Sequence, residues 1–501
     1  MRRALTRQFR LVRLRVLRIV AVFTAAATLL SITIRHESCA AQEAYEAIPF
    51  TFEGEIAACL HGDIDHDGDQ DLAVIQRSAA APEPRCILNF IRQVAPGRFD
   101  YPGRQTFLLP NTGALYDLAD VSGGSELELV ELRVDGVYQY ALRGVAFLSE
   151  PSRLIEFKEP ATFPRELESR AHDFAWALIP DAKECLAVPY ASTIDLWVAD
   201  DSGRFAIGST LPCGVISGGA GMRYDLPRPH EGPTPATLEL FLRSGDRWYG
   251  LRRSGPQSLD FQQRVVFEDH EATAQIFSLG DVFKSGSRVR DLNHDGTIDV
   301  VRWRNVGGVS RPACVIEVCF GPFNQSLPAT PHAEINIEGV VGYPEFADLN
   351  GDRRKDLVVC AVEVGTLAMA KSFVIKKVSP YLLAYRQRPD NSFSIAPDAR
   401  LKFDHRLDLD RPDPAPRPLI WVIGDTNGNG CDEIGIQNGS DRLQIHRPAD
   451  RDLLPEDFDR VACPNASSIE VLDLNGDARS DLILWHDAAS KEQSLTLLLA
   501  H

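Results

Sequence analysis

The stretch from Asp63 to Leu72, DIDHDGDQDL, decides the interpretation of this chain because it returns four more times. The other copies are DLNHDGTIDV from Asp291 to Val300, DLNGDRRKDL from Asp348 to Leu357, DTNGNGCDEI from Asp425 to Ile434 and DLNGDARSDL from Asp473 to Leu482. Each copy has an oxygen-bearing side chain at positions 1, 3, 5 and 9 and an aliphatic residue at position 10. This spacing lets a short loop surround a hard cation with oxygen ligands, and calcium is the usual occupant.

Short apolar runs flank the loops and predict strands. The pairs are Ile56 to Leu60 with Leu72 to Ile75, Trp421 to Ile423 with Ile434 to Ile436, and Ile469 to Leu472 with Leu482 to Trp485. Aliphatic and aromatic residues dominate these runs, and no long helical periodicity surrounds them. Because both faces of the runs are apolar, we expect strands packed between neighbouring sheets.

An EF-hand is excluded by the flanks and by position 12 of each loop. That motif needs flanking helices and a bidentate glutamate at position 12. Position 12 here is Val74, Arg302, Val359, Ile436 or Leu484. The loops therefore join strands, and the expected fold class is all-β.

The spacing of the loops predicts a repeat of about 59 residues, which suits a four-stranded propeller blade. Three degenerate units fill the gaps between the full loops: Asp120 to Leu129, Asp181 to Val188 and Tyr224 to Leu242. Eight blades follow from this count, or seven if one degenerate unit is an insertion. An isolated apolar run, Ile48 to Glu53, precedes the first unit, and the last unit ends with Ser494 to Leu499. We expect the first run to complete the last blade and close the ring.

With a carboxylate at position 9 and an aliphatic residue at position 10, the loops resemble those of the FG-GAP or VCBS repeat family. This is the calcium-loop propeller of integrin α-subunits and of many exported bacterial proteins. The resemblance implies a β-propeller with structural calcium held between the first two strands of a blade. It implies no catalytic residue and no organic cofactor.

The resemblance also implies a ligand set, carried over residue by residue. The predicted ligands are Asp63, Asp65, Asp67, Asp71, Asp291, Asn293, Asp295, Asp299, Asp348, Asn350, Asp352, Asp356, Asp425, Asn427, Asn429, Glu433, Asp473, Asn475, Asp477 and Asp481. Some loops depart from the family pattern, since Arg353 and Ala478 replace the turn glycine and Asn429 and Glu433 stand where aspartate is usual. His66 and His294 at position 4 are expected to be exposed turn residues.

The N-terminus predicts export. Residues 1–18 carry seven arginines, residues 19–34 are mostly apolar, and the small-residue stretch SCAAQ follows. This order is typical of a secretory signal peptide over residues 1–40, and an uncleaved N-terminal anchor is the alternative. The apolar run is short for a spanning helix, which favours the signal peptide. Residues 41–501 would then form a single propeller domain in the periplasm, the cell envelope or the medium.

The net charge narrows the classes of partner that the chain could bind. The formal net charge is −17, and loss of the arginine-rich residues 1–40 would make it more negative. Such an acidic body disfavours nucleic acid and anionic membrane surfaces as partners.

Export permits disulfides, for which Cys59 with Cys86, or Cys185 with Cys213, are close enough in sequence. We expect a monomer.

The function predicted from the sequence is a binding or interaction module for a carbohydrate or a protein, as in adhesion. No G-x-S-x-G, H-E-x-x-H, G-x-G-x-x-G or P-loop pattern occurs. The alternative is a polysaccharide lyase or glycoside hydrolase on the same scaffold, which would rest on fold analogy alone. Trp248, Trp303, Trp421 and Trp485 are candidates for stacking on sugars, with core packing as the competing role.

Overall fold

The structure is a computed structural model of the whole chain. It describes residues 45–78, 85–101, 105–110, 113–124, 127–144, 146–161, 174–176, 185–190, 193–200, 202–212, 239–244, 247–253, 261–268, 286–308, 311–323, 327–362, 377–406, 420–437, 442–463, 466–486 and 492–501. Within 239–253 and 261–268 only the backbone is described. All regular elements of these residues are strands or isolated bridges, which confirms the all-β prediction.

Eight antiparallel sheets of three to five strands follow one another along the chain. Sheet 1 contains β2 (Glu55–Gly62), β3 (Asp71–Ser78), β4 (Arg85–Ile91) and β7 (Gln105–Leu109). Sheet 2 contains β8 (Gly113–Ala119), β9 (Glu128–Arg133), β10 (Gly136–Tyr140) and β11 (Ser152–Glu156). Sheet 3 contains β12 (Ala175–Trp176), β13 (Cys185–Pro189), β14 (Thr193–Ala199) and β15 (Phe205–Pro212). Sheet 4 contains β16 (Glu239–Ser244), β17 (Arg247–Arg253) and β18 (Phe261–Glu268).

The second half repeats this organisation. Sheet 5 contains β19 (Gly286–Arg290), β20 (Asp299–Gly308), β21 (Arg311–Cys319) and β22 (Ala333–Glu338). Sheet 6 contains β23 (Val340–Val341), β24 (Glu345–Ala347), β25 (Asp356–Val362), β27 (Tyr381–Tyr385) and β28 (Ala399–Lys402). Sheet 7 contains β30 (Ile420–Val422), β31 (Ile434–Gln437), β32 (Arg442–His446) and β33 (Asp459–Ala462). Sheet 8 contains β34 (Ala466–Leu472), β35 (Asp481–His486), β36 (Glu492–Ala500) and β1 (Tyr45–Glu53). Two small ribbons pair β5 (Gln93–Ala95) with β6 (Arg98–Phe99) and β26 (Lys377–Val378) with β29 (His405–Arg406).

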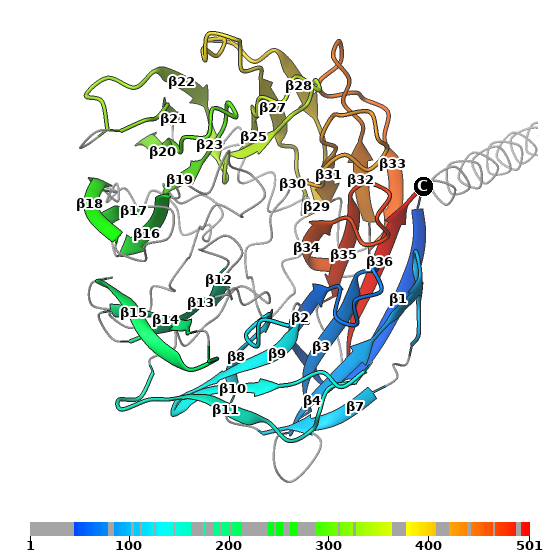
Figure 1. Cartoon of the computed structure of the whole chain (residues 1–501). Helices are drawn as coiled ribbons and strands as arrows, with labels where there is room; N and C mark the ends of the chain where they lie inside the picture. Colours follow the sequence, from blue (N-terminus) through cyan, green and yellow to red (C-terminus); the bar gives the residue numbers. More distant parts are fainter. Residues whose placement is uncertain are drawn as a thin grey trace, which may run out of the picture.

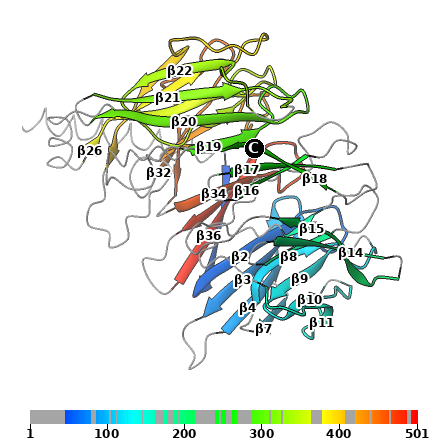
Figure 2. The same ribbon diagram turned by 90° about the vertical axis from the view of Figure 1, so that its left-hand side faces the viewer.

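The sheets are arranged around a common centre, as the blades of a β-propeller are (Figure 1). Figure 2, turned by 90°, shows β19 to β22 at the top and the strands of sheets 1 and 2 below them. The predicted strand–loop–strand units are confirmed, because every full loop joins the first two strands of a sheet or, in sheet 6, β24 to β25.

Apolar side chains fill the space between consecutive sheets. Six clusters of buried residues join sheet 8 to 1, 1 to 2, 2 to 3, 5 to 6, 6 to 7 and 7 to 8. Strands such as β35 are buried along their whole length, since they have a neighbouring sheet on each face. This confirms that runs with two apolar faces lie between sheets.

The first strand of the chain pairs with the last. β1 lies antiparallel to β36 over its full length, with Ile48 opposite Leu497. Phe50 and Phe52 on β1 then pack with Val74 of sheet 1 in a single apolar cluster. The two ends of the described chain therefore meet in one sheet and in one sheet-to-sheet core, as the isolated apolar run predicted.

The disulfide suggested for Cys59 and Cys86 is wrong. Cys59 on β2 packs toward sheet 8, whereas Cys86 on β4 packs toward sheet 2. The two thiols therefore lie on opposite faces of sheet 1, with β3 between their strands. Cys213 lies outside the described residues, as do residues 1–40 with their predicted signal peptide. Among the described residues no helix is long and apolar enough to cross a membrane.

Candidate metal centres

The five full loops lie in sheets that follow one another. Loop 1 is Asp63 to Leu72 in sheet 1, loop 2 is Asp291 to Val300 in sheet 5, loop 3 is Asp348 to Leu357 in sheet 6, loop 4 is Asp425 to Ile434 in sheet 7, and loop 5 is Asp473 to Leu482 in sheet 8. Since sheet 8 packs on sheet 1, these sheets form one uninterrupted series from 5 through 8 to 1 (Figure 1).

The aspartate at position 1 folds each loop around itself. Its carboxylate accepts the backbone N–H of position 6 in all five loops. The donors and N–O distances are Gly68 at 3.2 Å, Gly296 at 3.0 Å, Arg353 at 2.7 Å, Gly430 at 2.7 Å and Ala478 at 2.9 Å. The bond closes a tight turn of the kind that aspartate favours, which brings the next side chains round one point.

Two residues of every loop adopt a left-handed backbone, at positions 4 and 6. The φ values lie between 56° and 93° for the pairs His66 and Gly68, His294 and Gly296, Gly351 and Arg353, Gly428 and Gly430, and Gly476 and Ala478. Each loop thus has glycine at one of the two positions at least, which explains how it tolerates Arg353 or Ala478 at the other. His66 and His294 are exposed, as expected of turn residues.

The side chains at positions 3 and 5 hold the middle of the loop. Where position 3 is asparagine, its Oδ1 accepts the N–H of position 5, at 3.2, 3.0, 3.0 and 3.0 Å in loops 2 to 5. The side-chain oxygen at position 5 accepts the N–H of position 7 in every loop, at 2.7 to 3.0 Å. These backbone bonds turn the remaining oxygens toward the loop interior.

The carboxylate at position 9 is fully buried in all five loops. In loops 2 to 5 one of its oxygens accepts the N–H of position 2. The other oxygen accepts a backbone N–H from the end of the third strand or beyond in loops 1, 2, 3 and 5; the donors are Gln93, Gly321, Gln387 and Ala500. Burial raises the pKa of Asp71, Asp299, Asp356 and Glu433 to about 7, and the hydrogen bonds, which lower the pKa, offset only part of this shift.

Loop 1 brings the most carboxylate oxygens together. Asp63, Asp65 and Asp67 each offer an oxygen within 4.8 Å of the other two. Asp63 Oδ1, Asp65 Oδ1 and Asp71 Oδ2 are buried and have no donor in good hydrogen-bond geometry among the described residues, although the backbone N–H groups of Asp67 and Ile64 lie close to Asp65 and Asp71. Buried carboxylate oxygens without a donor are costly, and a hard divalent cation is the partner that would satisfy several at once. The donor set of loop 1 therefore fits calcium.

Arg92, at the end of the third strand of sheet 1, also faces loop 1. Its Nη2 donates to Asp67 Oδ2 at 2.6 Å, and its Nε contacts Asp65 Oδ2. The sequence reasoning missed this arginine, which partly balances the charge of the loop. The sequence did contain a sign of it, because the segments IRQVAPGRF and YRQRPDNSF share an Arg-Gln pair, Arg92-Gln93 in the first and Arg386-Gln387 in the second.

The other loops carry less uncompensated charge because position 3 is asparagine. The Nδ2 of Asn293 and Asn475 donates to the aspartate at position 5, at 3.0 and 3.3 Å. The Nδ2 of Asn350 and Asn427 donates instead to the carboxylate at position 9. Only loop 2 has a further buried oxygen without a donor among the described residues, Asp291 Oδ1. Loop 1 thus remains the strongest candidate centre.

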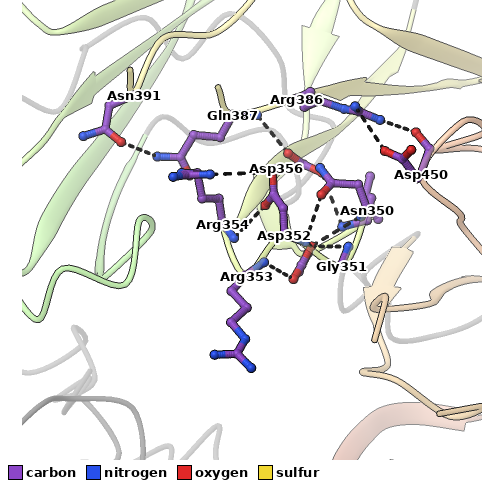
Figure 3. A network of polar contacts seen from close by, with 12 residues as sticks. Asn350, Gly351, Asp352, Arg353, Arg354, Asp356, Arg386, Gln387, Asn391 and Asp450 are labelled. Atoms are coloured by element: carbon purple, nitrogen blue, oxygen red, sulfur yellow. Dashed lines mark hydrogen bonds and ion pairs between the residues drawn. The ribbon is translucent and has the colours of Figure 1, made fainter. Parts of the chain in front are cut away.

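Loop 3 shows how a loop is tied to its surroundings (Figure 3). Asp356 accepts the backbone N–H of Gln387 at 2.8 Å and Nδ2 of Asn350 at 3.2 Å. Arg386, which precedes Gln387, reaches the backbone carbonyl oxygen of Asp450 in the next sheet. The loop therefore depends on the end of the third strand for its position.

The degenerate unit at Asp120 retains part of this geometry. Glu128 at position 9 is buried and accepts the N–H of Val121 at 3.0 Å, and Asp120 accepts that of Gly123 at 2.6 Å. The loop thus keeps its shape without the full set of oxygens. The loop residues 181–184 and most of Tyr224 to Leu242 lie outside the described residues.

The tryptophan candidates for sugar stacking give a mixed outcome. Trp303 and Trp485 are each only 2% exposed, so they belong to the core. Trp421 is half-buried and packs against the core between sheets 7 and 8. The side chain of Trp248 lies outside the described residues.

No family model matches the chain, and no curated protein matches it. Among solved structures, an Agrocybe aegerita lectin that recognises non-reducing terminal N-acetylglucosamine has 13% identity over 91% of this chain and 95% of its own, with a TM-score of 0.41. The Vanderwaltozyma polyspora Nup133 β-propeller domain has 10% identity over 75% of this chain and 91% of its own, with a TM-score of 0.35. A Lactobacillus plantarum protein has 14% identity over 69% of this chain and 84% of its own, with a TM-score of 0.34. Likeness this low carries no argument, so the proposals below rest on the geometry of this chain.

Proposed function

We propose that this chain is a closed, eight-bladed β-propeller of the FG-GAP or VCBS type. It binds structural calcium in loops 1 to 5 and acts after export as a binding module for a carbohydrate or a protein. The observation that carries the proposal is the shared geometry of the five loops, with position 1 closing the turn and position 9 buried beneath it.

The eight-bladed ring is supported by the sheets and by the cores between them. Each of the eight sheets is one blade, and β1 completes the eighth. Six of the eight contacts that such a ring requires are made by described side chains. The two remaining contacts involve sheet 4, of which only the backbone is described. A closed ring leaves no sheet at the end of the series without a neighbour.

Calcium is supported by the chemistry of the donors. The side-chain oxygens at positions 1, 3, 5 and 9 are all carboxylate or amide oxygens, which hard cations prefer, and loop 1 contains buried oxygens without a donor in good geometry among the described residues. The ligands would be the side chains at positions 1, 3, 5 and 9. The cation would neutralise adjacent carboxylates and fix the turn, so we assign it a structural role.

A binding role is supported by the placement of the loops on a rigid scaffold. Adjacent strands alternate in direction, so the calcium loops and the turns after the third strands lie at the same end of each blade. Loops that a rigid scaffold holds in place are the usual carriers of binding function. The negative charge of the chain favours neutral or basic ligands over nucleic acid.

A glycan array tests the binding role. The chain from residue 41 onward is applied in millimolar calcium and, separately, in chelator. We expect a defined set of glycans, or a purified basic protein tested beside them, to be retained in calcium only. The absence of retention of both in calcium would contradict the binding role.

A further inference from the structure

Hydrogen bonds connect the five calcium loops into one continuous series. The series, here called the loop arc, runs from loop 2 through loops 3, 4 and 5 to loop 1. This is the order in which their sheets pack on one another. In the links described below, the position-9 carboxylates of Asp71 and Asp356 are the only assigned ligand side chains that take part.

Position 8 of a loop donates its backbone N–H to the start of the preceding loop. Lys355 of loop 3 donates to Leu292 O of loop 2 at 2.8 Å. Asp432 of loop 4 donates to Asp348 O of loop 3 at 2.7 Å, and Ser480 of loop 5 donates to Asp425 O of loop 4 at 2.8 Å. The acceptors are at position 1 or 2, so each link joins the segments that the cation would fix.

A carboxylate strengthens the link between loops 3 and 4. Asp432 Oδ2 accepts the backbone N–H of Asp348 at 2.6 Å. The same oxygen pairs with Lys355 Nζ at 2.9 Å, and both side chains are largely buried. Asp432 thus binds the backbone at position 1 and the side chain at position 8 of the neighbouring loop.

Two equivalent glutamines join loops through the third strand. Gln93 donates its backbone N–H to Asp71 of loop 1 at 2.8 Å, and its Nε2 donates to Leu474 O of loop 5 at 2.9 Å. Gln387 donates its backbone N–H to Asp356 of loop 3 in the same way. Its side-chain amide, oriented with the nitrogen toward the nearby carbonyl oxygens, donates to Leu292 O of loop 2 at 2.9 Å.

We infer that the loop arc binds calcium cooperatively, so that a cation in one loop raises the affinity of the loops beside it. Filling a loop fixes the backbone at positions 1 to 9, and these residues hold the N–H and C=O groups that the next loop uses. The next loop then loses less conformational freedom when it binds, which is positive coupling. This inference rests on the proposed calcium sites.

Equilibrium dialysis tests the inference by measuring calcium bound per chain against free calcium. We expect a Hill coefficient clearly above 1 for the wild type. Asp432→Ala removes the side-chain link between loops 3 and 4, and Gln93→Leu removes the link between loops 5 and 1, and neither residue is an assigned ligand. Each change should lower the Hill coefficient and weaken the mean affinity about fivefold, the lower end of allosteric coupling.

A matched control removes an acidic side chain outside the arc. Asp390 lies in the turn after β27 and bonds Ser392 of that turn. Asp390→Ala should leave the Hill coefficient unchanged. A wild-type Hill coefficient of 1, or a higher value that neither Asp432→Ala nor Gln93→Leu lowers, would overturn the inference while the calcium sites stand. No calcium bound by the wild type at millimolar concentration would instead refute the proposed function.

Discussion

At the residue scale, the left-handed positions explain how one loop shape accommodates five different sequences. Glycine adopts positive φ freely, whereas another residue is penalised by roughly 1 kcal/mol or more. The pattern DxNxD was visible in the sequence, but the need for left-handed backbone at both positions 4 and 6 was not. In four loops glycine takes one of the two positions and histidine, arginine or alanine takes the other, whereas loop 4 has glycine at both.

Gly68 offers a direct test of that backbone requirement. Its φ is 93°, and a methyl group added there would meet nothing within 4 Å. Gly68→Ala should therefore lower the free energy of unfolding by about 1 to 2 kcal/mol through backbone strain alone. The reverse change, Ala478→Gly, should raise it by up to about 1 kcal/mol. Urea unfolding of both variants measures this, and changes of the same sign would contradict the account.

His446 gives a prediction for the effect of pH on stability. Burial lowers the pKa of His446 below 6.5, and the hydrogen bond to Pro455 O, which raises the pKa, offsets only part of this shift. Burial also lowers the pKa of His405. At these two histidines the unfolded chain therefore binds more protons than the folded chain below pH 6.5. Each histidine contributes a loss of stability as pH falls from 6.5 toward its folded pKa, by at most about 1.4 kcal/mol per pH unit. The buried position-9 carboxylates, whose pKa is raised, act in the opposite direction, so the contribution of a histidine is the difference between wild type and variant.

His446→Asn isolates this effect, since its amide nitrogen keeps a donor for Pro455 O. We expect the free energy of unfolding of the wild type, relative to that of the variant, to fall between pH 6.5 and 5, measured by urea unfolding of both proteins. Equal slopes in the two proteins would show that His446 does not titrate in this range.

At the element scale, the local sequence pattern predicted the strands around the loops, whereas the links between loops depend on long-range contacts. The runs beside loops 1, 4 and 5 formed β2, β3, β30, β31, β34 and β35 at nearly the expected positions. Their apolar faces and the turn residues are encoded within a few positions of one another. Gln93 and Leu474, in contrast, are 381 residues apart, so no local pattern could show that the glutamine joins two loops.

Burial also explains the positions of the tryptophans proposed for sugar stacking and of the cysteines proposed for a disulfide. Trp303 and Trp485 look the same in sequence as exposed aromatic residues, but both lie between packed sheets. Cys59 and Cys86 looked close in sequence, yet the alternation of side chains puts them on opposite faces of sheet 1. Such outcomes depend on which face of a strand meets a neighbouring sheet.

Phe50 on β1 tests the contribution of the first strand to the last sheet. It is fully buried and makes an edge-to-face contact with Tyr101 at 4.8 Å between ring centroids. Phe50→Ala should lower the free energy of unfolding by about 3 to 5 kcal/mol. Thr51→Ala, at the exposed neighbouring position, should change it by less than about 0.5 kcal/mol. A small effect of Phe50→Ala in chemical unfolding would mean that β1 contributes little to the fold.

At the scale of the whole molecule, the proposed ring of sheets carries a series of proposed calcium loops. The repeat length and the terminal strands predicted eight blades, or seven, and their closure; the described residues show antiparallel sheets in series with β1 beside β36, and the closed eight-bladed ring stays our proposal. Exported calcium modules bind with a Kd of roughly 10⁻⁴ to 10⁻³ M. In millimolar calcium a site at the tighter end contributes about 1.4 kcal/mol. Five such sites would supply a large part of the usual stability margin of a domain.

The thermal midpoint of unfolding, compared in millimolar calcium and in excess chelator, tests whether the loops bind structural calcium. We expect calcium to raise the midpoint by about 5 to 10 °C, given the entropy of unfolding for a chain of this size. Magnesium at the same concentration should raise it much less, because it demands a stricter geometry and keeps its water. An identical midpoint in calcium and in chelator would contradict a structural role for calcium in these loops.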